Sequence, residues 1–139
     1  MQRLARQDSN TAAVRWLANE IRFPASLDSA LRSVWEYVPD PPGVEYVASP
    51  DLQIVRALDR LKSSGVFRLW GDCDEAATLA ASLLLRLGEP SRIVAIRIPG
   101  APLFGHVFLR WSGGDIDPTV PADVLPISNY EESMELDVY

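Results

Sequence analysis

Four segments of the chain carry apolar residues three or four positions apart, which is the spacing of one face of an α-helix. Short polar residues precede these segments and glycine or proline follows them, as at the ends of many helices. The predicted helices run from Asn10 or Thr11 to Phe23, from Ser26 through Trp35, from Ser49 to Gly65, and from just after Gly71 to about Leu87. The last of them is rich in alanine and leucine, so we expect it to lie close against a sheet at the centre of the protein.

After Pro90 the pattern changes to runs of β-branched and aromatic residues, which indicate strands. We expect strands over residues 92–98 and 104–111, and a third short strand that ends at Asp117. Turns rich in glycine and proline separate these strands. Helices followed by hairpin-connected strands indicate an α+β fold, in which N-terminal helices and a central cysteine-bearing helix pack on a small antiparallel sheet.

Three stretches carry neither pattern. Residues 39–50 begin with Pro39-Asp40-Pro41-Pro42-Gly43 and predict a long loop, a kind of segment that often carries function. Residues 1–9 are polar and residues 128–139 are acidic, so we expect both stretches to be flexible. We interpret residues 1–139 as a single domain.

Composition and charge narrow the classes of partner. The chain has 139 residues, of which 47% are hydrophobic and 23% charged, as in globular proteins. Its formal net charge of −6 argues against nucleic acid or an anionic membrane surface as a partner, because both need a basic face. No apolar stretch is long enough to span a bilayer, and the first residues lack the apolar core of a signal peptide. We therefore expect a cytoplasmic location.

The chain has one cysteine, Cys73, and one histidine, His106. Cys73 lies at the start of the fourth predicted helix, where backbone N–H groups and the helix dipole favour a thiolate and can stabilise an oxyanion. His106 begins a predicted strand, and Asp117 ends the next one. A cysteine, a histidine and an aspartate in this order suit a nucleophile, its base and a group that orients the base.

Other interpretations of these residues remain open at this point. Cys73 can be a small buried hydrophobic residue, His106 a strand residue bonded to a carbonyl, and Asp117 a turn residue before proline. The acidic residues at positions 72, 74 and 75 also place negative charge beside the thiol, which disfavours the thiolate. We expect Cys73 to react only if a charged His106 lies close to it. The spacing follows no metal-ligand pattern, and we expect no metal and no other cofactor.

The turn after the second strand decides whether His106 and Asp117 can meet. If residues 112–113 form the loop, Trp111 pairs with Gly114, and Asp117 lies diagonal to His106 on the same face. Their α-carbons are then roughly 7–8 Å apart, within side-chain reach. If residues 113–114 form the loop, the two residues are about 13 Å apart, which is too far. The Cys–His–Asp hypothesis therefore predicts the first register.

Two stretches of the chain resemble the core motif of transglutaminase-like cysteine enzymes. Residues 71–80 (GDCDEAATLA) resemble the helix start that carries the nucleophile, and residues 87–92 (LGEPSR) resemble the turn into the first core strand. His106-Val107 matches the histidine at the head of a following strand, and Asp117-Pro118-Thr119 matches the aspartate ahead of Pro-Thr. The resemblance covers about residues 65–120.

This resemblance implies a papain-like fold, a Cys73–His106–Asp117 triad, and hydrolysis or acyl transfer at amide bonds of a protein or peptide substrate. In transglutaminases an upstream tryptophan helps to hold the oxyanion. Trp35 and Trp70 are therefore candidates for that role beside the backbone amide of Cys73, although neither lies in a recognisable motif.

The GDCD form of the motif is also similar to small stand-alone members associated with bacteriophages and prophages. This similarity implies an alternative, a non-catalytic structural or assembly protein that retains the fold. Such a protein would reside in a virion and bind phage structural proteins, with the proline-rich loop and the acidic C-terminal residues as contact regions. Fold by itself does not separate the two expectations, because function depends on the site.

Overall fold

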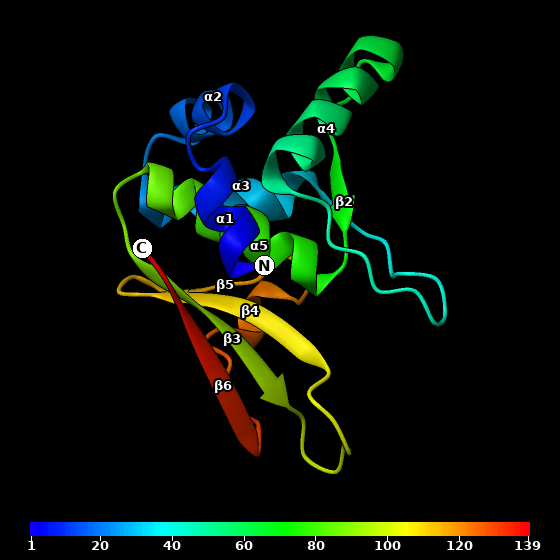
Figure 1. The fold of residues 1–139 in the computed structure, drawn as a ribbon, viewed down its shortest axis with the longest axis vertical. Helices are drawn as coiled ribbons and strands as arrows, with labels where there is room; N and C mark the ends of the chain where they lie inside the picture. Colours follow the sequence, from blue (N-terminus) through cyan, green and yellow to red (C-terminus); the bar gives the residue numbers. More distant parts are fainter.

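The computed structural model describes residues 1–139 and places most of the helices on one face of a four-stranded antiparallel sheet (Figure 1). The helices are α1 (Gln2–Asp8), α2 (Ala12–Ile21), α3 (Leu27–Val34), α4 (Pro50–Ser64) and α5 (Cys73–Arg86). The strands are β1 (Trp35–Tyr37), β2 (Leu69–Gly71), β3 (Ser91–Arg97), β4 (His106–Trp111), β5 (Gly114–Ile116) and β6 (Glu132–Val138). The α+β class predicted from the sequence is confirmed.

Side-chain caps define the starts of the predicted helices. The Thr11 hydroxyl accepts a hydrogen bond from the Val14 N–H at the start of α2. The Ser49 hydroxyl accepts one from the Leu52 N–H at the start of α4. Gly65 ends α4 in the left-handed conformation. The predicted second helix is shorter than expected, because Trp35 belongs to β1 and not to α3.

The larger sheet has the strand order β5-β4-β3-β6. Trp111 pairs with Gly114 and Leu109 with Ile116, so the β4–β5 turn is the one at residues 112–113. This is the register that the Cys–His–Asp hypothesis requires. It places Asp117, the first residue after β5, on the same face as His106.

Both stretches expected to be flexible are structured, which corrects the prediction. Residues 2–8 form α1, in which Ala5 is fully buried and the Asp8 carboxylate accepts a hydrogen bond from the Asp51 N–H. Residues 132–138 form β6, which pairs with β3 along its whole length. The acidic side chains of this strand are not simply solvated, because Arg92 and Arg97 of β3 form ion pairs with them.

The main core surrounds α5. Every residue from Glu75 to Leu84 is buried, because α1, α2 and α4 contact this helix from one side and β3 and β4 from the other. A smaller core on the opposite face of the sheet contains Val94, Ile96, Phe108 and Ile127. The sequence prediction that the cysteine-bearing helix packs centrally on the sheet is confirmed. No helix has the length and apolar character needed to cross a membrane.

The short strands β1 and β2 form a second sheet that the sequence did not predict. They run parallel, with Tyr37 opposite Gly71, and the Val38 N–H donates to the Gly71 carbonyl oxygen at 3.0 Å. Both strands therefore end at the same edge. The loop after β1 leaves this edge beside the first turn of α5, which follows β2 (Figure 1).

Candidate active site

Cys73 is the first residue of α5, and its neighbours fix the start of this helix. Asp72 Oδ1 accepts a hydrogen bond from the Asp74 N–H at 3.0 Å, and Glu75 Oε2 accepts one from the Asp72 N–H at 3.1 Å. The first hydrogen bond of the helix runs from the Ala76 N–H to the Asp72 carbonyl. The Cys73 N–H therefore belongs to the helix-start amides that have no acceptor within the helix. Such an amide can bind an oxyanion.

One of the three acidic residues beside Cys73, Glu75, carries less charge than the sequence suggests. Burial, followed by a hydrogen bond with the Asp72 side chain and the Asp72 charge, raises the pKa of Glu75 to about 8. Burial also raises the pKa of Asp74, with the charges of Asp72 and Asp40 acting in the same direction. At neutral pH the Glu75 carboxyl is therefore mostly protonated. The objection that three carboxylates disfavour a thiolate is correspondingly weaker.

The structure brings His106 and Asp117 together. His106 is the first residue of β4, and its Nε2 lies 2.5 Å from Oδ2 of Asp117. The Asp117 residue is only 1% exposed, whereas the His106 side chain is 18% exposed. One nitrogen of the imidazole is thus held by a buried carboxylate. The other nitrogen, Nδ1, remains for a partner on the solvent side.

Cys73 lies close enough to His106 to affect its charge. Burial by itself lowers the pKa of His106, but the hydrogen bond with Asp117 and the interaction with Cys73, together with the charges of both, raise it to about 10. The imidazole is therefore cationic at neutral pH. A cation in contact with a cysteine favours the thiolate form. The structure thus places the three residues singled out in the sequence near one another, with a hydrogen bond between His106 and Asp117 and with Cys73 close to the imidazole.

The second carboxylate oxygen of Asp117 is also bound. Oδ1 accepts hydrogen bonds from the Thr119 N–H at 3.0 Å and from the Thr119 hydroxyl at 2.6 Å. The Asp-Pro-Thr order in the sequence therefore has a local reason, since the threonine closes a turn back onto the aspartate. With Oδ1 engaged in this way, Oδ2 is the oxygen that faces His106.

The structure bears on one of the two tryptophan candidates for the oxyanion. Trp35 is buried, and its indole N–H donates to the Gly71 carbonyl oxygen at 3.3 Å. Trp70 lies with its ring 5.7 Å from the Arg60 guanidinium carbon, a cation–π contact. The Trp35 N–H is therefore engaged within the fold. The Cys73 amide and Trp70 remain the candidates for the oxyanion donor.

Sequence reasoning missed Tyr37, which the parallel β1–β2 pair places next to the site. Burial, and then the charges of Cys73, Asp72 and Asp40, raise the pKa of the Tyr37 phenol. Tyr37 nevertheless remains 58% exposed, so its ring is accessible at the edge of the site. Only the pairing of β1 with β2 reveals this position, and two strands of three residues each give no clear signal in the sequence.

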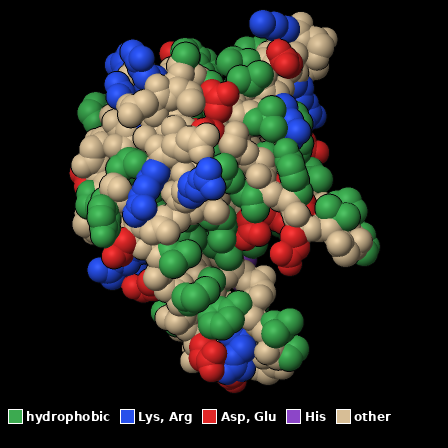
Figure 2. Space-filling model, viewed as in Figure 1, with side chains coloured by type: hydrophobic (Ala, Val, Ile, Leu, Met, Phe, Trp, Pro, Cys, Tyr) green, Lys and Arg blue, Asp and Glu red, His purple; other side chains and the backbone are tan.

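Figure 2 shows a hollow on this side of the molecule. A small part of the histidine surface (purple) is visible at the edge of this hollow, and acidic side chains (red) border it (Figure 2). The loop after β1 and the lower end of the sheet lie on either side of the hollow (Figures 1 and 2). The His106 side chain is 18% exposed, so solvent reaches this side of the site.

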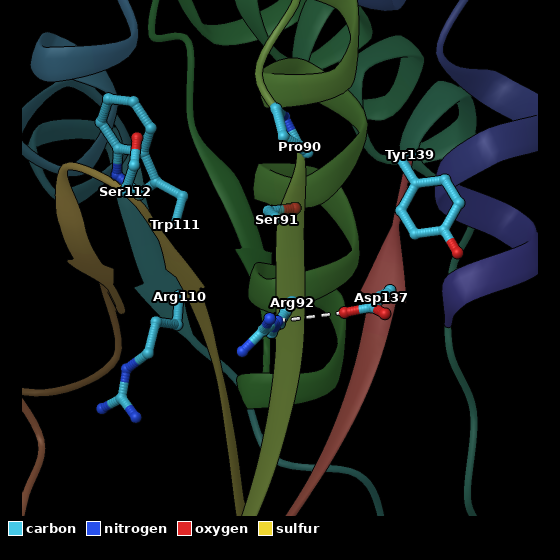
Figure 3. A pocket seen from close by; sticks show the side chains of 8 residues that line it. All are labelled: Pro90, Ser91, Arg92, Arg110, Trp111, Ser112, Asp137 and Tyr139. Atoms are coloured by element: carbon cyan, nitrogen blue, oxygen red, sulfur yellow. Dashed lines mark hydrogen bonds and ion pairs between the residues drawn. The ribbon is translucent and has the colours of Figure 1, made fainter.

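A separate pocket lies at the opposite end of β4 (Figure 3). It has a volume of about 520 Å³ and is lined by Pro90, Ser91, Arg92, Arg110, Trp111, Ser112, Asp137 and Tyr139. Both of its arginines already have carboxylate partners. Arg92 pairs with Asp137 of β6, and Arg110 pairs with Asp115. We place the candidate site at Cys73 because the reactive groups meet there. No set of three or more His, Cys, Asp or Glu side chains is arranged to hold a metal ion.

Comparison with protein-family models, curated proteins and solved structures finds no match to this chain. The assignment of the site therefore depends on the geometry described above and on the motifs in the sequence.

Proposed function

We propose that the protein is a transglutaminase-like cysteine hydrolase or acyltransferase that acts on amide bonds. The observation that carries this proposal is the position of His106, between the buried carboxylate of Asp117 and the thiol of Cys73 at a helix start. The central helix packed on an antiparallel sheet is compatible with a papain-like core. The motifs around Cys73, His106 and Asp117 support the same family.

In the proposed first step, the Cys73 thiolate attacks the carbonyl carbon of an amide. A carbon–sulfur bond forms, and the carbonyl electron pair moves onto oxygen, where the Cys73 N–H stabilises the negative charge. The imidazolium of His106 then gives its Nδ1 proton to the amide nitrogen as the carbon–nitrogen bond breaks. The products are a free amine and a thioester on Cys73.

In the second step, neutral His106 accepts a proton from water or from a primary amine that attacks the thioester. Collapse of this intermediate breaks the carbon–sulfur bond and restores the thiolate and the imidazolium. Water gives a carboxylic acid, and an amine gives a new amide. Asp117 holds Nε2 throughout, so the imidazole ring keeps the orientation that both proton transfers need.

The single cysteine makes a direct test simple, because a thiol reagent reports on Cys73 alone. Iodoacetamide labelling at pH 6 is expected to be roughly ten times faster than labelling of an ordinary thiol, which is almost fully protonated there. His106→Ala should remove this advantage, whereas Arg92→Gln, a change on the far end of the sheet, should leave it intact. Labelling at the rate of a free thiol, unchanged by His106→Ala, would contradict the proposal.

A second experiment addresses the reaction itself. The protein is incubated with a peptide library, with and without an added primary amine, and the products are identified by mass spectrometry. Cleaved or deamidated peptides indicate hydrolysis, and amine adducts indicate transfer; both should be absent with Cys73→Ala.

The alternative function, a non-catalytic structural or assembly protein, has one supporting observation. Large apolar side chains of the loop after β1, including Val44 and Tyr46, are about half exposed. A partner that covers this loop would also cover the entrance to the site. Unreactive Cys73 in both experiments, together with a stable complex that protects the loop from proteolysis, would favour this alternative.

A further inference from the structure

Asp28 and Arg32 lie one turn apart on α3 and form an ion pair. Nη2 of Arg32 lies 3.0 Å from Oδ2 of Asp28, and Nε of Arg32 lies 3.3 Å from the same oxygen. About three quarters of each side chain is shielded from solvent, with 23% and 24% exposed. An exposed pair of this kind contributes little to stability. Here both partners have further contacts.

Both side chains bind the backbone of Asp117. Oδ1 of Asp28 accepts a hydrogen bond from the Asp117 N–H at 2.9 Å, and Nη2 of Arg32 donates to the Asp117 carbonyl oxygen at 2.8 Å. Nη1 of Arg32 also donates to the Val120 carbonyl oxygen. The pair thus holds the peptide groups on both sides of the Asp117 α-carbon.

These contacts replace the strand pairing that Asp117 lacks. β5 ends at Ile116, so Asp117 has no ladder partner, and the following residue is Pro118, which has no N–H to donate. The α3 pair and the Thr119 turn therefore account for the fixed position of this segment. A carboxylate 2.5 Å from an imidazole is sensitive to small shifts of its own backbone.

We propose that Asp28 and Arg32 are positioning residues of the site, which fix the backbone of Asp117 so that its carboxylate holds the His106 ring toward Cys73. The catalytic consequence rests on the proposed cysteine chemistry. The effect on His106 does not, because it concerns only the contact between the imidazole and the Asp117 carboxylate.

The test compares Asp28→Ala with Asp28→Asn. Alanine removes the acceptor of the Asp117 N–H, whereas asparagine keeps an oxygen at that place. Two quantities are measured on folded protein: the NMR titration of the single imidazole, and the pH profile of Cys73 alkylation. With Asp28→Ala the proton affinity of His106 is expected to fall about tenfold or more, and alkylation at pH 6 to slow by a similar factor. Asp28→Asn should recover most of both.

Val14→Ala truncates a fully buried side chain of α2 and is the matched control for a loss of stability alone. It should leave both readouts at their wild-type values. If Asp28→Ala does not fold, Arg32→Gln, which removes the guanidinium contact to the Asp117 carbonyl, is measured in the same way. Wild-type titration and alkylation in the folded variants would overturn the inference, as would an equal shift with Val14→Ala.

The two proposals fail separately. If wild-type Cys73 is unreactive but Asp28→Ala still moves the His106 titration, the proposed reaction is wrong and the positioning role stands. If Cys73 is reactive and neither variant changes the two readouts, the positioning role is wrong and the proposed reaction stands.

Discussion

A β-carbon placed on Gly71 would lie 2.7 Å from the β-carbon of Glu75, closer than two such atoms can pack. Gly71 also has a φ of +148°, which residues with side chains rarely adopt. The absence of a side chain lets Glu75 fold back over the turn and bind the Asp72 N–H. The glycine two positions before Cys73 thus has a steric role in fixing the helix start.

Replacing Gly71 with alanine should therefore lower the free energy of unfolding by about 2–3 kcal/mol, from strain in the backbone and displacement of Glu75. Urea denaturation measures this loss. Gly100→Ala is the control, because Gly100 has a φ of +83° but no atom within 4 Å of an added β-carbon. It should lose only about 1 kcal/mol. Equal losses at the two positions would show that the contact with Glu75 is unimportant.

Glu75→Gln should stabilise the protein, and more so as the pH rises. In the folded state the pKa of Glu75 is about 8, whereas a glutamate in an unfolded chain has a pKa near 4.5. Between these values the folded protein binds more protons than the unfolded chain, so wild-type stability falls as the pH increases. Glutamine has no proton to lose. Urea midpoints at pH 5 and pH 8.5 should show a larger gain at the higher pH, and a gain independent of pH would contradict the burial argument.

The imidazole of His106 should remain protonated well above neutral pH. Its signal, the only one of its kind in the protein, is expected to titrate near pH 10 in an NMR experiment. Asp117→Asn removes the carboxylate charge and should lower this pKa toward 6.5. The raised value also stabilises the fold, fully below pH 6.5 and progressively less as the pH rises to about 10. Titration near 6.5 in the wild-type protein would exclude the contacts that we describe.

Cys73 should react faster with cationic thiol reagents than with anionic ones. Asp72 and Asp74 flank Cys73 in the chain, and Asp40, in the loop after β1, adds to the negative electrostatic potential at this helix start. A several-fold preference is expected at low ionic strength, for example between positively and negatively charged methanethiosulfonates. Asp74→Asn should reduce the preference, and 1 M salt should nearly remove it. Equal rates at low salt would mean that these carboxyl groups do not influence the approach to Cys73.

Local chemistry explains which features could be predicted from the sequence. The starts of α2, α4 and α5 follow from Thr11, Ser49 and Asp72, because each side chain bonds to an amide in the next turn. The β4–β5 register follows from a tight turn at residues 112–113, and this register places Asp117 beside His106. Each of these features depends on contacts between residues a few positions apart, so the local sequence is enough to predict it.

The features that the sequence did not predict depend on partners far away in the chain. The acidic C-terminal residues form β6 by pairing with β3 along its whole length, and two arginines of β3 lie beside their carboxylates. Nothing near these residues in the sequence indicates that partner. The strands β1 and β2 are stable only as a pair. The Asp28–Arg32 pair can be recognised in the sequence as an ordinary helix-surface ion pair, but its target, the backbone of Asp117, lies about 90 positions further along the chain.

The loop after β1 and the helix that begins with Cys73 start at the same edge, because β1 and β2 run parallel. The loop is held mainly by bonds within itself, from the Tyr46 N–H to Asp40 and from the Val44 N–H to the Pro41 carbonyl. The groups that hold the imidazole come from other parts of the chain. The loop and the groups that hold the imidazole are therefore separate in the chain. Exchanging residues 39–48 should change the surface at the edge of the site while the contact between His106 and Asp117 stays the same.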